Sequence, residues 1–249
     1  MPTRTDRWPA GTPCWLDISV PDVAAAKEFY GAVVGWDFED QGSDMGDYVI
    51  ARRAGNDAAG LGPLQSPDQP TAWMLYFAVD DIGASIQAVR DNGGQVIMDR
   101  TEMAGIGNMA VVADNQGVAI GLWDAAPMIG AQVYNEPGGL VWEQLVVPDV
   151  EAARAFYTSV FPLDFTDQFG PGVALRGTSD TIAGFSESTD GPPRWDCFLS
   201  VDDAVKSEAI ALEHGGSSVQ KVELAEWGHL GVVKDPWGAR IGIGDANLG

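Results

Sequence analysis

Apolar and polar residues alternate in short stretches of the chain, and Ala-rich segments with apolar residues at helical spacing follow them. In residues 15–20, Leu16, Ile18 and Val20 alternate with more polar positions, which predicts a half-buried strand. Asp22 stands where a helix N-cap is expected, and Gly35 ends the helical run that precedes it. Three short strands are predicted next, so the unit has the order β-α-β-β-β.

The same order of elements recurs along the rest of the chain. After a linker at 62–71, we expect a strand over 73–79, a helix from Asp80-Asp81 to 89, and strands at 95–98, 109–113 and 118–123. A second linker at 124–137 precedes a strand over 141–147 and a helix over 149–161. The last unit has a strand over 195–201, a helix over 202–214 and a hairpin of strands 230–233 and 239–243.

Two segments of the chain are copies of each other. Residues 11–40 and 138–167 are identical at 14 of 30 positions without a gap, including Trp15 with Trp142 and Phe29-Tyr30 with Phe156-Tyr157. Self-similarity at half the chain length indicates two domains of one fold. We place these domains at 11–126 and 138–247. The repeated β-α-β-β-β unit predicts an α+β class.

Charge and cysteine content limit which classes of partner and which cellular compartment are expected. The formal net charge of −22 argues against nucleic acid and anionic membranes, and it suits either solubility or a cationic ligand. Cys14 and Cys197 form no metal-binding motif, so we expect free thiols in a reducing compartment. Residues 1–10 lack a secretory leader's apolar core, no run is apolar enough to span a bilayer, and we expect a cytoplasmic protein. Two halves can pair within one chain, so we expect a monomer, with a dimer as the alternative.

Several motifs together resemble one superfamily. A strand, then P-D-V, an Ala-rich helix with F-Y, a strand ending in V-D-D, and D-P-W-G before an apolar strand resemble the vicinal oxygen chelate superfamily. That superfamily includes glyoxalase I, extradiol dioxygenases and bleomycin-resistance proteins, and the chain is similar to its two-domain actinobacterial members, described as glyoxalase-like or "hydroxylase". The resemblance implies tandem glyoxalase-like domains, each with two βαβββ units that form a cupped mixed sheet with helices outside.

The resemblance also implies where a metal ion would be held. Metal-dependent members place a His or Glu seven residues before each helix-capping Asp, and a Glu on the last strand. Counting back from Asp22, Asp80, Asp149 and Asp202 gives Trp15, Trp73, Trp142 and Trp195, and the last-strand positions are Gly121 and Gly242. Because indole and glycine offer no metal-binding atom, we predict neither a metal ion nor another cofactor.

Tryptophans at these positions would give each cup an aromatic wall, which can stack against a planar ligand. The predicted ligand-binding residues are Trp15, Trp73, Phe77 and Trp123 in the first cup, and Trp142, Gln144, Trp195, Cys197 and Arg240 in the second. Asp17 and His229 are the candidate catalytic acids or bases, whereas Glu143 is interpreted as a surface charge. In the alternative interpretation, the aromatic residues fill the cups as core and Arg240 pairs with a nearby carboxylate.

Three functions fit these observations. The first, which we favour, is a metal-independent protein that binds a planar aromatic small molecule, either neutral or cationic. The second is a cofactor-less enzyme of secondary metabolism, a cyclase, isomerase, lyase or oxygenase, with Asp17 or His229 as acid or base. The third is an interaction protein with filled cups. Replacing Asp17 by Asn separates the second function from the first, because binding needs no proton transfer.

Overall fold

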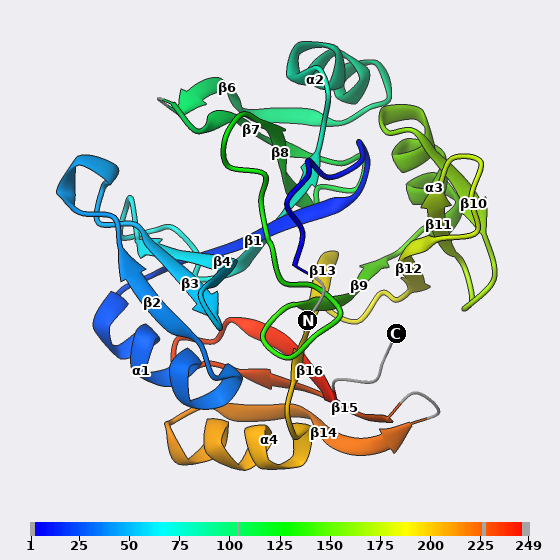
Figure 1. Ribbon diagram of the computed structural model, residues 1–249. Coiled ribbons are helices and arrows are strands. Elements are labelled where there is room, and N and C mark those ends of the chain that lie inside the picture. Colours follow the sequence, from blue (N-terminus) through cyan, green and yellow to red (C-terminus); the bar gives the residue numbers. More distant parts are fainter. Residues whose placement is uncertain (1–2, 104, 226–227, 246–249) are drawn as a thin grey trace.

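Each half of the chain folds into one eight-stranded mixed sheet with two α-helices (Figure 1). The structure is a computed structural model and describes residues 3–103, 105–225 and 228–245. The arrangement confirms the α+β class and the tandem repeat of one fold. No helix within the described ranges is long and apolar enough to cross a membrane.

The elements follow the predicted order in both halves. The first half contains β1 (Pro13–Val20), α1 (Val23–Val34), β2 (Asp37–Asp40), the 3₁₀ helix η1 (Ser43–Met45), β3 (Val49–Arg53), β4 (Asn56–Pro63), β5 (Trp73–Ala78), α2 (Ile82–Asp91), β6 (Gln95–Met103), β7 (Gly107–Ala113) and β8 (Ala119–Ala125). The second contains β9 (Leu140–Val147), α3 (Val150–Val160), β10 (Leu163–Thr166), β11 (Gly172–Leu175), β12 (Thr181–Glu187), β13 (Arg194–Val201), α4 (Ala204–Glu213), β14 (Ser217–Ala225), β15 (Gly228–Lys234) and β16 (Arg240–Asp245).

Strand order shows how the two units of each half combine. The first sheet runs β2-β3-β4-β1-β5-β8-β7-β6, and the second runs β10-β11-β12-β9-β13-β16-β15-β14. Within each unit the first strand pairs in parallel with the last, and the two first strands pair antiparallel at the centre of the sheet. Each half is therefore two β-α-β-β-β units joined along their first strands.

Aspartates begin all four of these helices. Asp22, Asp81, Asp149 and Asp203 each accept a hydrogen bond from the backbone N–H three residues later, which satisfies one of the free donors of the first turn. Gly35 ends α1 in the left-handed conformation with φ of 79°, which suits glycine. In the two Asp-Asp pairs the second aspartate is the cap, one residue later than the counts from Asp80 and Asp202 assumed.

One hydrophobic core joins the two halves. Side chains from the helix-facing sides of both sheets and from the helices form a single cluster of buried residues. Helix α1 contacts α4, and α2 contacts α3, so helices of different halves lie side by side (Figure 1). The other, concave face of each sheet is left to form a cup.

Candidate functional site

Register in the central strand pair decides which side chains enter the first cup. Asp17 lies opposite Met74 and Ile18 lies opposite Trp73 in the antiparallel pair of β1 and β5. Directly opposed residues project to the same face of a sheet. Trp73 therefore shares the helix-facing side with Ile18, whereas Met74 shares the concave side with Asp17.

Four predicted ligand-binding residues do not lie in the cups, and their predicted orientation was wrong. They are Trp73, Phe77, Trp195 and Cys197, all of which belong to the shared core or pack against it. The error comes from the helix caps, because the counts began one residue early in both Asp-Asp pairs. A shift of one residue moves every side chain of a strand to the opposite face.

Two of these residues instead connect sheets to helices. The Trp73 indole Nε1 donates a hydrogen bond of 3.2 Å to the hydroxyl of Tyr30 in α1. The Trp195 Nε1 donates one of 3.0 Å to the hydroxyl of Tyr157 in α3. Both indoles thus have structural hydrogen-bond partners within the shared core.

With the corrected caps, the positions that correspond to metal ligands in relatives can be assigned. They are Trp15, Met74 and Gly121 in the first cup and Trp142, Asp196 and Gly242 in the second. The carboxylate of Asp196 already accepts hydrogen bonds from two arginines. No group of three or more His, Cys, Asp or Glu residues in the described part of the chain could hold a metal ion. These residues do not fit a divalent cation, which prefers several oxygen, nitrogen or thiolate ligands.

The two glycines in this set are required by aromatic rings that lie over them. A Cβ atom at Gly121 would come within 2.0 Å of the Tyr76 ring, and one at Gly242 within 2.1 Å of the Phe198 ring. Any larger residue would have to displace the ring. A glutamate at either position is therefore incompatible with the packing of the concave face.

The first cup is occupied by its own side chains. Trp15, Tyr76 and Trp123 are only 4%, 6% and 7% exposed and belong to a second hydrophobic cluster on the concave face. The hydroxyls of Tyr48 and Tyr76 each donate a hydrogen bond of 3.2 Å to the Asp17 carboxylate. Burial raises the pKa of Asp17 to about 7, although both hydrogen bonds favour the ionised form.

The second cup contains a polar cavity of about 290 Å³. Arg194 and Arg240 both donate to the carboxylate of Asp196, with N···O distances between 3.0 and 3.2 Å. This confirms the alternative in which Arg240 pairs with a carboxylate, and it leaves one excess positive charge in the cup. Gln144 also lines this cavity, as predicted from strand alternation.

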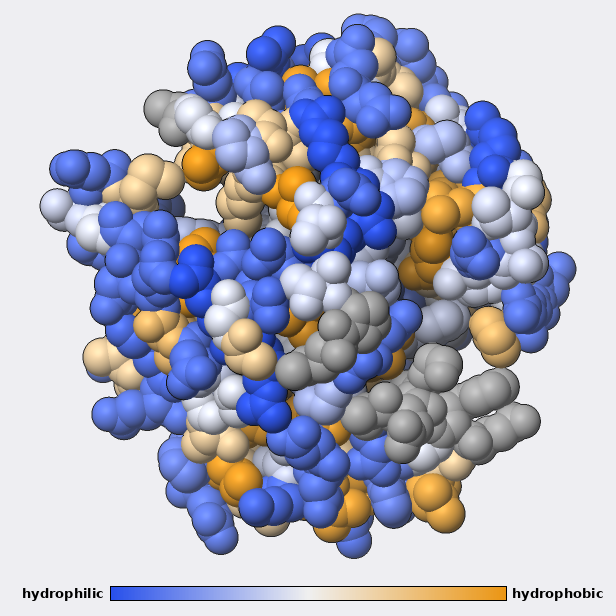
Figure 2. Space-filling model, viewed as in Figure 1, coloured by the Kyte–Doolittle hydropathy of each residue, from blue (hydrophilic) through white to orange (hydrophobic). Residues whose placement is uncertain are grey.

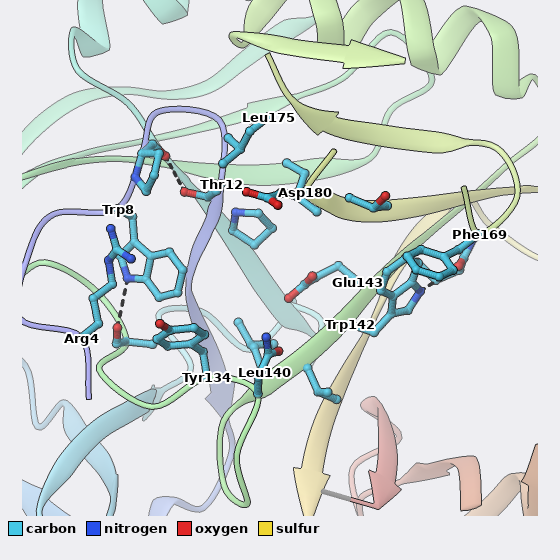
Figure 3. Close-up of a pocket in the computed structure, with 18 of the residues that line it drawn as sticks. Arg4, Trp8, Thr12, Tyr134, Leu140, Trp142, Glu143, Phe169, Leu175 and Asp180 are labelled. Carbon is cyan, nitrogen blue, oxygen red and sulfur yellow. Dashed lines mark hydrogen bonds between the residues drawn. The ribbon is translucent and has the colours of Figure 1, made fainter. Parts of the chain in front are cut away.

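A larger cleft of about 800 Å³ opens on the other side of Gln144. Its walls come from the N-terminal segment 3–12, the linker between the halves, and strands β9, β11 and β12 (Figure 3). On the molecular surface the same face is hollowed beside the N-terminal segment, and hydrophobic side chains line the hollow (Figure 2). The sequence predicts only irregular connecting structure for both of these segments, because alternation of polar and apolar residues does not reveal that a loop forms a wall.

Aromatic side chains stand at both ends of this cleft (Figure 3). At one end the Trp8 and Tyr134 rings lie edge to face with centroids 5.1 Å apart. At the other end Trp142 meets Phe169 edge to face at 6.2 Å, and its Nε1 donates to the Gln144 side chain at 3.0 Å. Trp142 and Gln144, both predicted to bind ligand, thus lie in the cleft wall.

Glu143 points from β9 into the space between these aromatic pairs (Figure 3). Its side chain is buried, with 7% of the residue exposed, and no hydrogen bond or ion pair joins it to another described residue. Burial raises the pKa of Glu143 to about 8. The interpretation of this glutamate as a surface charge was wrong. The repeat aligns Glu143 with Leu16, a signal in the sequence that the position is buried.

The sequence predicted His229 at the rim of the second cup, but alternation along β15 places it on the side of Val233, which faces the helices and the shared core. The His229 Nδ1 is 2.8 Å from a carboxylate oxygen of Asp245, and the His229 side chain is 41% exposed. Burial raises the pKa of Asp245, but hydrogen bonds from Ala204 and His229 outweigh it and lower the pKa overall. The neighbouring residue Leu230 lines the large cleft.

Comparisons with known proteins agree with the fold and the repeat. The family model described as Glyoxalase/Bleomycin resistance protein/Dioxygenase superfamily matches residues 14–122 and 139–243. The chain is 33% identical over 255 residues to the glyoxylase-like protein CFP32 of Mycobacterium tuberculosis, covering 98% of this chain and 97% of CFP32. It is 34% identical over 260 residues to the anthracycline biosynthesis protein DauV of Streptomyces sp. strain C5, covering 95% and 94%. The Mn(II)-bound glyoxalase of Novosphingobium aromaticivorans has a TM-score of 0.67 over 96% of this chain and 83% of that enzyme, and at 16% identity this likeness concerns the fold alone.

Proposed function

Since the chain belongs to the Glyoxalase/Bleomycin resistance protein/Dioxygenase superfamily, we propose that it binds a flat polycyclic aromatic metabolite without the help of a metal ion. The binding site is the cleft between the N-terminal segment, the linker and the second sheet. The observation that carries this proposal is the pair of aromatic contacts, Trp8 with Tyr134 and Trp142 with Phe169, at the two ends of that cleft.

The size of the cleft suits such a ligand. Its volume of about 800 Å³ lies within the range of sites for drug-sized molecules, roughly 300–1,000 Å³. Stacking on an aromatic side chain contributes about 0.5–1.5 kcal/mol beyond the burial of apolar area. Similarity to proteins of anthracycline biosynthesis supports fused aromatic rings as the ligand class, because anthracyclines contain a planar fused-ring system.

Two exposed phenylalanines offer a matched test of the site. Phe169 lines the cleft and is 49% exposed, whereas Phe165 is 50% exposed and is not among the cleft-lining residues. We expect Phe169→Leu to weaken binding of acridone, a flat tricyclic probe, about two- to tenfold in a calorimetric titration. Phe165→Leu should leave the affinity unchanged. Equal affinities for both variants, or no binding of acridone to the unaltered protein, would count against this cleft.

Metal independence is tested on the purified protein. The second cup offers a metal ion one carboxylate, Asp196, which is already paired with two arginines. The first cup offers the carboxylate of Asp17, which is hydrogen-bonded to tyrosine. These ligand sets favour binding without a metal ion. Elemental analysis should find no stoichiometric zinc, iron, nickel or manganese. Binding of acridone should also be unchanged after dialysis against a chelator, and loss of binding that returns with one of these metals would reject the proposal.

A second candidate function is a cofactor-less enzyme of secondary metabolism. One observation favours it, namely that Asp17 has a pKa near neutrality and contacts two tyrosine hydroxyls inside the first cup. Such a carboxyl can accept and return a proton at physiological pH. A substrate would reach Asp17 only by displacing the aromatic side chains that fill this cup. If this activity exists, Asp17→Asn abolishes turnover of the substrate but retains its binding, whereas His229→Gln tests the other candidate in the same assay.

A further inference from the structure

The repeat shows that the fold does not need a carboxyl group at Glu143. When the two copies are aligned, Glu143 occupies the position of Leu16. Leu16 is completely buried in the shared core, on the helix-facing side of β1. A buried carboxyl without a hydrogen-bond partner destabilises the folded state in comparison with a leucine. Packing therefore does not account for the carboxyl in the second half.

No group within the described protein neutralises Glu143. The residue opposite it on β13 is Cys197, a buried thiol whose pKa is raised by burial and by the nearby Glu143 and Asp196 carboxyls, so it stays uncharged. The other charged residues that line the cleft are Arg4 and Asp180.

Arg4 is already engaged elsewhere. Its Nε and Nη2 donate to the backbone carbonyls of Asp6 and Arg7, and its guanidinium lies over the Trp8 ring at 4.5 Å from the centroid. Asp180 carries the same sign of charge as an ionised Glu143 and is exposed. The described part of the chain therefore supplies no partner for the Glu143 carboxylate.

We propose that Glu143 recognises a positively charged nitrogen on the flat ligand by pairing with it through its carboxylate. This inference rests on the proposed function, because it assigns one chemical feature to the ligand of the same cleft. The position of Glu143 between the two aromatic pairs places the charge contact beside the stacked rings (Figure 3). Aromatic faces also attract a cation, so both features of the cleft favour the same ligand.

Binding of such a ligand is linked to the release of a proton. Burial raises the pKa of Glu143 to about 8, so the carboxyl is mostly protonated in the empty cleft at pH 7. A cation binds the ionised form, and its binding therefore displaces the proton. The ionised fraction rises from about one tenth at pH 7 to about nine tenths at pH 9, which predicts roughly tenfold tighter binding over this interval.

Two probes of similar shape separate charge recognition from stacking. The first, 10-methylacridinium, is a flat permanent cation with no titratable proton, and the second, acridone, is a neutral ring system. Calorimetry in buffers of different ionisation enthalpy counts the protons released. For the unaltered protein we expect 10-methylacridinium to release close to one proton at pH 7 and to bind about tenfold more tightly at pH 9.

The variants Glu143→Gln and Glu143→Leu should bind 10-methylacridinium without proton release and without the pH dependence. Both should bind acridone as the unaltered protein does. Glu143→Leu introduces the residue of the first repeat and is expected to fold at least as stably, which keeps the test independent of folding. Asp180→Asn is the matched control, and it should retain the proton release.

Three results would overturn the inference. Proton release that persists in Glu143→Gln places the titrating group elsewhere, although the proposed function then still stands if the ring binds. Preferential binding of acridone that depends on Glu143 shows that the protonated carboxyl donates to a carbonyl instead. If neither ring system binds the unaltered protein, the proposed function fails, and this inference fails with it.

Discussion

The hydroxyl of Tyr30 in α1 donates a hydrogen bond of 2.9 Å to Asp235, which lies 205 residues further along the chain in the turn between β15 and β16. Tyr157 in α3 makes the equivalent bond of 3.2 Å to Asp114 in the turn between β7 and β8. Each half thus attaches its first helix to the last turn of the other half. The F-Y and D-P-W-G motifs, which carry the resemblance to the superfamily, hold the two halves together in this protein.

Loss of one such bond should destabilise the whole chain. Replacing Tyr30 by Phe leaves the buried Asp235 carboxylate with only the backbone N–H donors of its own turn, and it also removes the acceptor of the Trp73 indole Nε1. We expect the free energy of unfolding to fall by about 1–3 kcal/mol in urea titrations. Tyr134→Phe is the control, since no hydrogen bond of the Tyr134 hydroxyl is found among the described residues. Equal effects of the two changes would contradict a role for the bond.

The glycines under the aromatic rings make a second prediction. Gly121→Ala places a Cβ atom within 2.0 Å of the Tyr76 ring, so the ring and strand must move, and we expect a loss of about 3 kcal/mol. Gly83 lies in α2, where the nearest atom to an added Cβ is 3.4 Å away. Gly83→Ala should instead stabilise the protein by about 0.5–1 kcal/mol, because alanine favours the helix. Thermal unfolding of both variants decides the matter.

Asp17 should make stability depend on pH. Its pKa is raised from 3.8 to about 7 in the folded protein, so the folded state binds a proton more tightly than the unfolded chain does. The free energy of unfolding therefore falls as pH rises between these two values, and the lost stability amounts to about 2–4 kcal/mol. Asp17→Asn should remove this dependence and be the more stable protein at pH 8. The exposed Asp180→Asn serves as control, and a parallel pH profile for Asp17→Asn would refute the prediction.

The arginine pair of the second cup predicts unequal effects of two substitutions. Asp196→Ala leaves Arg194 and Arg240 without their shared carboxylate, and we expect a loss of about 2–4 kcal/mol. Arg240→Met should cost less, because Arg194 still pairs with the buried Asp196. Chemical denaturation of the two variants measures the difference, and a larger effect for Arg240→Met would show that the pairing is not what matters.

Much of the fold could be predicted from the sequence because its signals are local. The alternation around Leu16, the N-cap at Asp22 and the copy of residues 11–40 at 138–167 indicate the unit, its order and its repetition. The orientation of Trp73 and Trp195 could not be derived as easily. The two aspartates in each Asp-Asp pair are equally good caps, and the choice between them decides to which face of the sheet each side chain projects.

The candidate site was harder to predict than the fold. The large cleft depends on segments without regular structure, and Trp8 lies in its wall with its Nε1 donating to the backbone carbonyl of Ala131, more than a hundred residues away. One signal in the sequence does point to the cleft, because the repeat aligns Glu143 with Leu16. A charged residue whose counterpart in the other copy is apolar core indicates that something other than packing has selected it.

The reciprocal bonds of Tyr30 and Tyr157 have a consequence for how this chain can change over generations. A single ancestral half that associated with a second copy of itself about a two-fold axis would make both contacts with one tyrosine and one aspartate. Once the copies are fused, the attachment is supplied within one polypeptide, and neither concave surface has to match the other. The first cup, with Asp17 hydrogen-bonded to two tyrosines, and the second cup, with two arginines around Asp196, can then acquire different functions. The contacts of Tyr30 and Tyr157 that hold the halves together need not change.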